Sequence, residues 1–266
     1  MCRMGQENIA SGVRTLFVIK SVQVLIAGLS AFIWIPDAAQ ALVGQSNSGG
    51  GAARHTVMVL KAAKSGAGNC SGVVMSPSII LTAAHCVTPA LQVAVLLPGR
   101  DKPAPILADK VSVHPEYVPD AIRKRVRSID LALLHIAGAL PPQFVAPAIA
   151  TSATPALGSE YLVAGFGIED ESRNRLSGEL RSGLLRARNP LSSILLWAED
   201  PQRKGFGACT GDSGGPIFNT NVSELIAITV WSSGARGRKC GDLTQGILVA
   251  PHRRWIESTI TQWSAK

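Results

Sequence analysis

Three residue types that together can carry acyl transfer stand in short, distinctive contexts. His85 lies in LTAAHC, Asp130 begins DLALL, and Ser213 lies in GDSGGP. A serine hydroxyl is a poor nucleophile at neutral pH, and it needs a nearby base whose tautomer is held by a third group. A histidine and a carboxylate supply these two functions, so the three residues could together attack a carbonyl carbon. A lone histidine or aspartate without such flanks is assigned no role; these are His55, His114, His135, His252 and Asp120.

These motifs, in this order, resemble those of the chymotrypsin-like serine proteases, and the chain is identified as a secreted member of bacterial type. The resemblance runs from about Leu42 to the C-terminus. It implies that Ser213 attacks the scissile carbonyl, that His85 is first base and then acid, and that Asp130 orients the imidazole. It also implies an oxyanion hole formed by the backbone N–H groups of Gly211 and Ser213.

The composition favours an all-β fold. Hydrophobic residues make up 46% of the chain and charged residues 17%, which argues against disorder. Short β-rich runs separated by turn signals are typical of sandwiches and barrels. The runs are 56–60, 79–81, 93–97, 131–136, 161–164, 194–197, 225–231 and 246–249. The resemblance implies two packed antiparallel six-stranded β-barrels with a C-terminal helix.

The expected organisation is a signal peptide followed by one protease domain. The ranges are signal peptide 1–41, protease domain 42–266, first barrel about 42–140, crossover 141–158, second barrel about 159–250 and helix 253–263. The helix is expected because aromatic and isoleucine side chains between Trp255 and Trp263 fall on one helical face.

The first residues have the pattern of an export signal. Arg14 and Lys20 precede the apolar run Val22–Ile35, and Ala39 and Ala41 put small residues where signal peptidase cuts. We therefore expect cleavage after Ala41 and a secreted or periplasmic protein. The run is shorter than the ~20 residues that span a bilayer. A retained signal would instead tether the protease to a membrane.

Four cysteines remain after such a cut, and an even number in an exported chain predicts two disulfides. The resemblance implies the pairs Cys70–Cys86 and Cys209–Cys240. No CxxC pair or histidine cluster is present, so neither zinc nor another cofactor is expected.

The same cut would create a new amino terminus at Leu42, in the sequence LVGQ. Members of the family are activated when a freed terminus pairs with the aspartate that precedes the nucleophile. We therefore expect the Leu42 ammonium to enter the body of the protein and pair with Asp212. The alternative is that LVGQ is a flexible leader.

Motif positions also predict a specificity pocket. Gly207 stands at its base, where members that cleave after Lys or Arg have an aspartate, and Ser232 and Gly246 line its walls. Small uncharged groups favour neutral or apolar substrate side chains. Val230 replaces the serine that in the family helps to hold the catalytic carboxylate, so one hydrogen bond to Asp130 is expected to be missing or replaced by water.

The formal net charge is +8, which attracts acidic partners. The charges are scattered without interleaved aromatic residues, so no nucleic-acid partner is expected. We expect a monomer acting on protein or peptide substrates. The basic residues Arg123, Lys124, Arg125 and Arg127 either favour acidic substrates from the rim of the cleft or form a solvated loop. The competing function is that of a catalytically silent homologue acting as a binding module.

Overall fold

The computed structural model describes residues 42, 47–64, 66–98, 104–152, 154–171, 178–235 and 237–265. The predicted signal peptide lies outside this part of the chain. Within it, no helix is both long enough and apolar enough to span a membrane.

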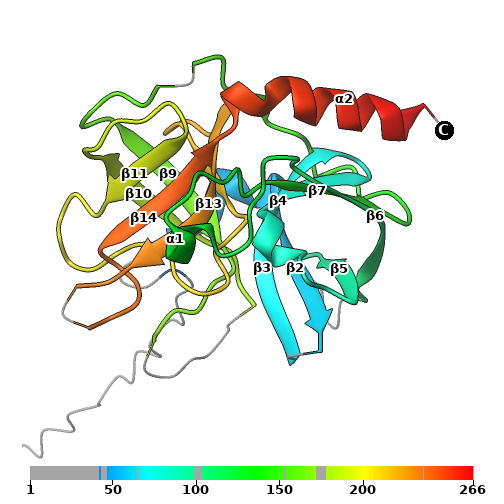
Figure 1. Cartoon of the computed structure of the whole chain (residues 1–266), viewed down its shortest axis with the longest axis horizontal. Coiled ribbons are helices and arrows are strands. Elements are labelled where there is room, and N and C mark those ends of the chain that lie inside the picture. The colour runs from blue at the N-terminus through cyan, green and yellow to red at the C-terminus, as the bar shows by residue number, and fades with distance from the viewer. Residues whose placement is uncertain are drawn as a thin grey trace, which may run out of the picture. The chain divides into compact units, whose positions relative to one another are not determined.

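Six antiparallel strands close into the first barrel (Figure 1), in the order β2-β3-β4-β7-β6-β5. Their bounds are β2 Thr56–Ala63, β3 Gly66–Ser76, β4 Ile79–Thr82, β5 Gln92–Leu96, β6 Ile106–Val113 and β7 Ala132–Ile136. Val57, Val59, Ile80 and Leu134 are fully buried in one apolar cluster. Closure leaves no free sheet edge, and alternate side chains fill the interior.

A second barrel follows, in the order β10-β11-β14-β13-β12-β9, and the pairing of β9 with β10 closes it. Its strands are β9 Glu160–Gly165, β10 Arg181–Ala187, β11 Leu195–Glu199, β12 Pro216–Phe218, β13 Glu224–Ser233 and β14 Leu243–Leu248. A short strand, β8 (Ala148–Ile149), pairs in parallel with β13. The prediction of two six-stranded barrels is confirmed.

The start of the domain differs from expectation. Strand β1 (Asn47–Ser48) pairs with Ser182 and Arg181 of β10, and therefore belongs to the second barrel and not to the first. The chain then passes through the 3-10 helix η1 (Gly50–Arg54) into β2. Asn47 and Ser48 precede the first barrel in the sequence, but their backbone hydrogen bonds to β10 place them in the second barrel.

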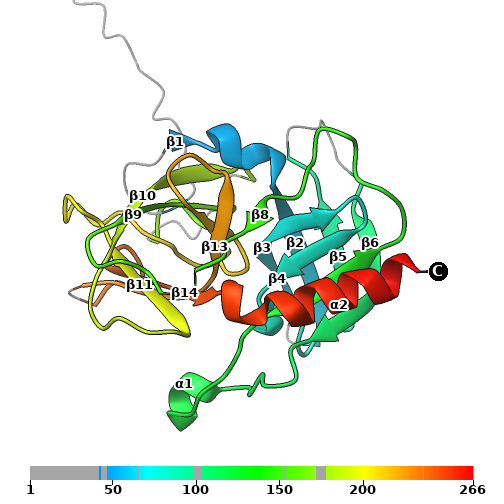
Figure 2. The same cartoon turned by 90° about the horizontal axis from the view of Figure 1, so that it is seen from above.

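The C-terminal helix α2 (Arg253–Ser264) follows the 3-10 helix η3 (Ala250–His252). Figure 2 shows it lying along the strands of the first barrel, although it leaves from the second. Ile256 is fully buried, and the Trp263 ring meets the His135 ring of β7 edge-on at 6.1 Å between centroids. The helix therefore joins the end of the second barrel to the outside of the first.

Candidate active site

A cavity of about 1350 Å³ is lined by residues from both barrels, and His85, Asp130 and Ser213 all belong to its lining. His85 lies in the 3-10 helix η2 (Ala84–Cys86), directly after β4, and Asp130 lies just before β7. Since Thr82 of β4 pairs with Ala132 of β7, the ends of these two strands bring His85 and Asp130 together.

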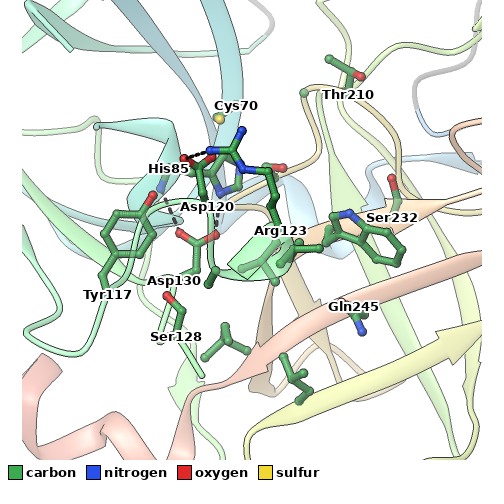
Figure 3. A pocket seen from close by; sticks show the side chains of 18 of the residues that line it. Cys70, His85, Tyr117, Asp120, Arg123, Ser128, Asp130, Thr210, Ser232 and Gln245 are labelled. Carbon is green, nitrogen blue, oxygen red and sulfur yellow. Dashed lines mark hydrogen bonds and ion pairs between the residues drawn. The ribbon is translucent and has the colours of Figure 1, made fainter. Parts of the chain in front are cut away.

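The carboxylate of Asp130 holds His85 through two hydrogen bonds (Figure 3). The imidazole Nδ1 lies 2.6 Å from Oδ2, and the His85 backbone N–H donates to Oδ1 at 2.9 Å. A proton on Nδ1 leaves the Nε2 lone pair free to accept another. The pair is therefore arranged as a base whose tautomer is fixed by the carboxylate.

Val230 lines the same cavity and has no side-chain donor. Among the described residues, His85 supplies the only hydrogen bonds that Asp130 accepts through its side chain. The orientation of this carboxylate therefore depends on His85 itself.

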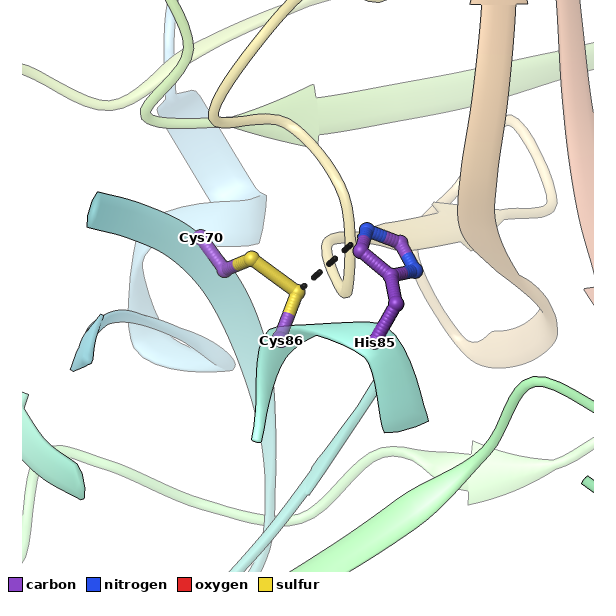
Figure 4. A group of neighbouring side chains, drawn as sticks. All are labelled: Cys70, His85 and Cys86. Atoms are coloured by element: carbon purple, nitrogen blue, oxygen red, sulfur yellow. Dashed lines mark hydrogen bonds between the residues drawn. A yellow bond between two sulfur atoms is a disulfide. The ribbon is translucent and has the colours of Figure 1, made fainter. Parts of the chain in front are cut away.

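Both expected disulfides are present, with Cα–Cα distances of 6.1 Å for Cys70–Cys86 and 5.0 Å for Cys209–Cys240. Cys70, His85 and Cys86 gather at a spacing that could suit a metal ion (Figure 4). The sulfur atoms of Cys70 and Cys86 form a disulfide, however, so neither is available as a thiolate ligand. The same holds for Glu171 with Cys209 and Cys240.

Ser213 lies in a tight turn before β12, and this turn depends on glycine. Gly211 has a φ of +99°, and a Cβ there would lie 2.5 Å from Nδ2 of Asn69. Gly214 has a φ of +84°, and a Cβ there would lie 2.1 Å from Oγ1 of Thr82. Any larger residue at either position would push the turn away from the first barrel.

Ser71 of β3 ties this turn to the first barrel. Its backbone N–H donates to the Ser213 carbonyl at 2.8 Å, and its hydroxyl donates to the Gly211 carbonyl at 2.9 Å. The same hydroxyl accepts the backbone N–H of Phe166 at 2.9 Å. The carbonyls of Gly211 and Ser213 therefore point toward the first barrel, and within the described residues their N–H groups have no acceptor.

The turn also brings Ser213 beside the segment that carries His85. The Ser213 carbonyl oxygen lies 3.6 Å from Sγ of Cys86, and that sulfur lies 3.8 Å from Nε2 of His85. No hydrogen bond joins the Ser213 hydroxyl to His85 in the part of the chain that the structure describes. Catalytic hydrogen bonds of this kind are often long without substrate and shorten in the substrate complex.

Asp212, the residue before Ser213, is fully buried. Its carboxylate accepts the backbone N–H groups of Gly167 and Cys209, each at 2.8 Å. Burial raises the pKa of Asp212 from 3.8 to about 7, although both hydrogen bonds favour the charged form. No cation pairs with Asp212 among the described residues.

Leu42, the expected partner of Asp212, is also fully buried. Its side chain belongs to the apolar cluster of the second barrel that includes Val163 of β9, while Asp212 packs against Gly165 of the same strand. In the uncut chain the nitrogen of Leu42 is an uncharged peptide N–H, and among the described residues no hydrogen bond or ion pair joins it to Asp212. Leu42 and Asp212 thus lie near the same strand without being joined.

The three predicted pocket residues lie in different places. Ser232 lines the cavity, but Gly207 and Gly246 do not. A Cβ on Gly246 would point at Ile217 and Ala227, because Gly246 faces the barrel interior. A Cβ on Gly207 would meet Gly241 Cα at 3.2 Å and Thr244 Oγ1 at 3.3 Å.

Other residues line the cavity where the pocket was expected. Gln245 faces it, since Gln245 is paired with Trp231 and has the opposite orientation from Gly246. Lys239 and Cys240 line it as well. Sequence reasoning did not identify Lys239, because it lies in the loop between β13 and β14, and the length of this loop made the alignment of the pocket residues ambiguous.

The basic loop contributes three of its four cations to the cavity wall. Arg123 pairs with Asp120 at 2.7 Å and Arg127 pairs with Glu116 at 3.0 Å, both near the surface. Arg125 also lines the cavity, whereas Lys124 does not and binds the carbonyl of Pro119.

Sequence reasoning did not identify Lys61, Asn69 or Ser71, which also contribute to the site. The Nζ of Lys61 donates to the His85 carbonyl at 2.9 Å, and the Asn69 side chain donates to the Phe166 carbonyl at 3.1 Å. No sequence motif marks these residues, because each acts on the backbone of a residue far along the chain.

The two barrels and the residues gathered between them are those of a serine endopeptidase. Comparison with known proteins leads to the same class. The family model described as Trypsin matches residues 42–256, and the chain belongs to this family. It is a chymotrypsin-like serine endopeptidase.

Curated relatives include granzyme M of Rattus norvegicus, 29% identical over 221 residues, covering 73% of this chain and 81% of the relative. Granzyme M of Homo sapiens is 29% identical and covers 73% and 80%. Kallikrein-1E2 of Equus caballus is 27% identical and covers 72% and 80%. These relatives are animal proteins, and they give no support to the expectation of a bacterial type.

Among solved structures, the chain is similar to neuropsin, a serine protease expressed in the limbic system of mouse brain. The TM-score is 0.62 at 20% identity, covering 76% of this chain and 93% of neuropsin. At this identity the likeness concerns the fold alone.

Proposed function

We propose that the protein is a secreted endopeptidase that hydrolyses peptide bonds through Ser213, His85 and Asp130 by way of an acyl-enzyme. The observation that carries this proposal is the doubly hydrogen-bonded His85–Asp130 pair in the cavity that Ser213 also lines. The two disulfides support an exported protein, since such bonds persist in oxidising compartments.

In the first step, Nε2 of His85 takes the Ser213 hydroxyl proton as the oxygen attacks the scissile carbonyl. The negative charge on the carbonyl oxygen is stabilised by the N–H groups of Gly211 and Ser213, each worth about 3 kcal/mol. His85 then protonates the leaving amine, and Asp130 stabilises the imidazolium. Water then takes the place of the amine: His85 removes its proton as it attacks the acyl carbon, and His85 returns the proton to the Ser213 oxygen as the acid product leaves.

Activation depends on the new terminus at Leu42. Cleavage after Ala41 gives Leu42 an ammonium group, which pairs with the buried Asp212 carboxylate. An isolated buried charge is costly, and removing one partner of such a pair costs about 3–5 kcal/mol. The ion pair therefore orders the turn from Cys209 to Ser213, and no separate zymogen cleavage is needed.

The residue bound on the acyl side is neutral or apolar. Ser232 is small and uncharged, and among the described residues no acidic one belongs to the cavity lining beside the Cys209–Cys240 disulfide, because Glu171, which lies near this disulfide, is not part of the lining. This preference separates the protein from endopeptidases that cleave after Lys or Arg.

The test is hydrolysis of a peptide library by the chain beginning at Leu42, with Ser213→Ala as the matched control. We expect cleavage after neutral or apolar residues, and no cleavage by the alanine variant above background. Equal activity of both proteins would contradict the nucleophile assignment. Binding of peptides without hydrolysis by either protein would favour the silent homologue, and preference for Lys or Arg would contradict the pocket assignment.

A further inference from the structure

Lys61 places a cation directly beside the proposed catalytic histidine. Its Nζ donates to the His85 carbonyl at 2.9 Å, and the residue is half-buried and lines the cavity. An ammonium group has three donors, and the bond to His85 uses one of them. Two donors remain for a group that enters the cavity.

The strand pairing holds Lys61 in this position. Lys61 of β2 is paired with Gly68 of β3, and a Cβ on Gly68 would lie 3.3 Å from Cε of Lys61. The missing side chain at Gly68 therefore leaves room for the aliphatic part of Lys61 to cross the strand toward His85.

In the proposed reaction, the leaving half of the substrate would pass beside this cation. The acyl half must reach the oxyanion donors of Gly211 and Ser213. The leaving amine must instead reach Nε2 of His85, which lies 3.8 Å from Sγ of Cys86. The disulfide leads from Cys86 to Cys70 on β3, and Gly68 lies two residues before Cys70 on that strand.

The cavity has more positive than negative charge around this path. Its charged lining residues are Lys61, Arg123, Arg125, Arg127 and Lys239 against Asp120 and Asp130. Arg123 and Arg127 have carboxylate partners, whereas Glu171 accepts only the backbone N–H of Lys239 and not its ammonium. Among the described residues, Lys61 has a carbonyl partner and no carboxylate, so its charge is not neutralised.

We propose that Lys61 selects substrates with an aspartate or glutamate in the segment that leaves, on the C-terminal side of the scissile bond. This selectivity rests on the proposed endopeptidase function. A carboxylate there binds the two free donors of the ammonium while Lys61 keeps its bond to the His85 carbonyl. A charge-assisted pair in a half-buried cleft is stronger than the same pair in open solvent.

The test uses peptides with one acyl half and with glutamate or glutamine at each of the first three positions after the scissile bond. For the chain beginning at Leu42, we expect kcat/KM to be about fivefold to tenfold higher with glutamate at one of these positions. Rising ionic strength should reduce this ratio, because salt screens exposed pairs.

Three variants distinguish recognition of a substrate carboxylate by Lys61 from a purely structural role of its bond to the His85 carbonyl. Lys61→Met should bring the glutamate-to-glutamine ratio close to one, and Lys61→Arg should retain the preference. The matched control is Lys64→Met, in the same hairpin but outside the cavity lining, and it should leave the ratio unchanged. A purely structural role of Lys61 would lower both rates equally and leave the ratio intact.

The outcomes are distinguishable from failure of the proposed function. Wild-type protein that cleaves both peptides equally overturns the role of Lys61 and leaves the endopeptidase in place. A preference that persists in Lys61→Met does the same. Failure of wild-type protein to cleave any peptide, with Ser213 unreactive toward a fluorophosphonate, contradicts the endopeptidase itself.

Discussion

The two barrels hold their parts of the site by different means. The first barrel fixes His85 and Asp130 through the paired ends of β4 and β7 and through the Cys70–Cys86 disulfide, next to an apolar core. The second barrel presents Ser213 on a turn that is held by backbone hydrogen bonds and contains a buried carboxylate, Asp212.

The His85–Asp130 pair is complete once the first barrel has folded, whereas the turn that carries Ser213 contains a buried carboxyl group whose charge needs a partner. The His85–Asp130 pair needs nothing from outside the first barrel. The turn from Cys209 to Ser213 encloses Asp212, whose pKa is raised by burial, and no cation pairs with it in the part of the chain that the structure describes. In the proposed mechanism, the first barrel therefore supplies a preformed base, and the second supplies a nucleophile whose turn is ordered when the Leu42 ammonium pairs with Asp212.

The largest effect is expected in the first barrel. Asp130→Asn keeps the shape of the side chain but favours the wrong tautomer of His85, and the same change in this family lowers kcat by about 10⁴-fold. We expect a similar loss in peptide hydrolysis, with the unfolding transition little changed. A loss below about tenfold would show that Asp130 does not orient the base.

The next largest effect is expected when the amino terminus proposed to pair with Asp212 is displaced. A chain with one extra residue before Leu42 should lose activity by about 10²-fold or more, because its ammonium would be misplaced from Asp212. Full activity in the extended chain would contradict the activation mechanism. The chain beginning at Leu42 is the control.

The same contrast should appear in stability against pH. A carboxyl group whose pKa is higher in the folded state than its ordinary value of 3.8 favours folding when protonated. The uncut chain should therefore lose stability as pH rises from about 4 to about 7. The chain beginning at Leu42 should not, because its ammonium stabilises the Asp212 carboxylate. Urea unfolding at several pH values measures both.

The contact between the barrels is tested by Ser71→Ala. The change removes the hydroxyl that joins Phe166 N–H to the Gly211 carbonyl and leaves both groups buried without that partner. We expect a loss of about 1–3 kcal/mol in the free energy of unfolding, together with a lower kcat as the oxyanion turn loosens. Unchanged kcat would show that the first barrel does not position this turn. Ser258→Ala, on the exposed face of α2, is the control.

The smallest effect concerns the helix that joins the barrels. Burial lowers the pKa of His252 from 6.5 to about 4, and it lowers that of His114, whose ring meets His252 edge-on. Trp255 packs against His114, and Glu116 and Arg127 are the charged groups nearby. In the chain beginning at Leu42, where no opposing slope from Asp212 is expected, the free energy of unfolding should fall as pH falls from 6.5 to about 4, and His252→Phe should flatten this slope. An unchanged slope would show that His252 does not cause it.

Much of the fold could be predicted because its strands are apolar and short. The predicted runs coincide with strands such as β2 and β13. Two strands in the first barrel were missed for a physical reason. β3 (GAGNCSGVVMS) is built largely of small residues, and the apolar residues of β6 (ILADKVSV) are interrupted by Asp109, Lys110 and Ser112.

The site could be predicted only where a motif encodes it. His85, Asp130 and Ser213 stand in recognisable flanks. Lys61 and Ser71 act through contacts with the backbone of residues far along the chain. The Lys61 contact forms only when the first barrel has closed, and the Ser71 contacts form only when the two barrels have packed. The pocket residues depend on the register of β14, which one residue of shift reverses from cavity to core. That register placed Gln245 and not Gly246 on the cavity side.

The most direct measurement is mass mapping of the chain beginning at Leu42 after reaction with a fluorophosphonate. The account predicts one adduct, on the peptide containing Ser213, and a rate of labelling that falls sharply in His85→Ala. Absence of the adduct from folded, correctly processed protein, or an equal labelling rate in His85→Ala, would contradict it.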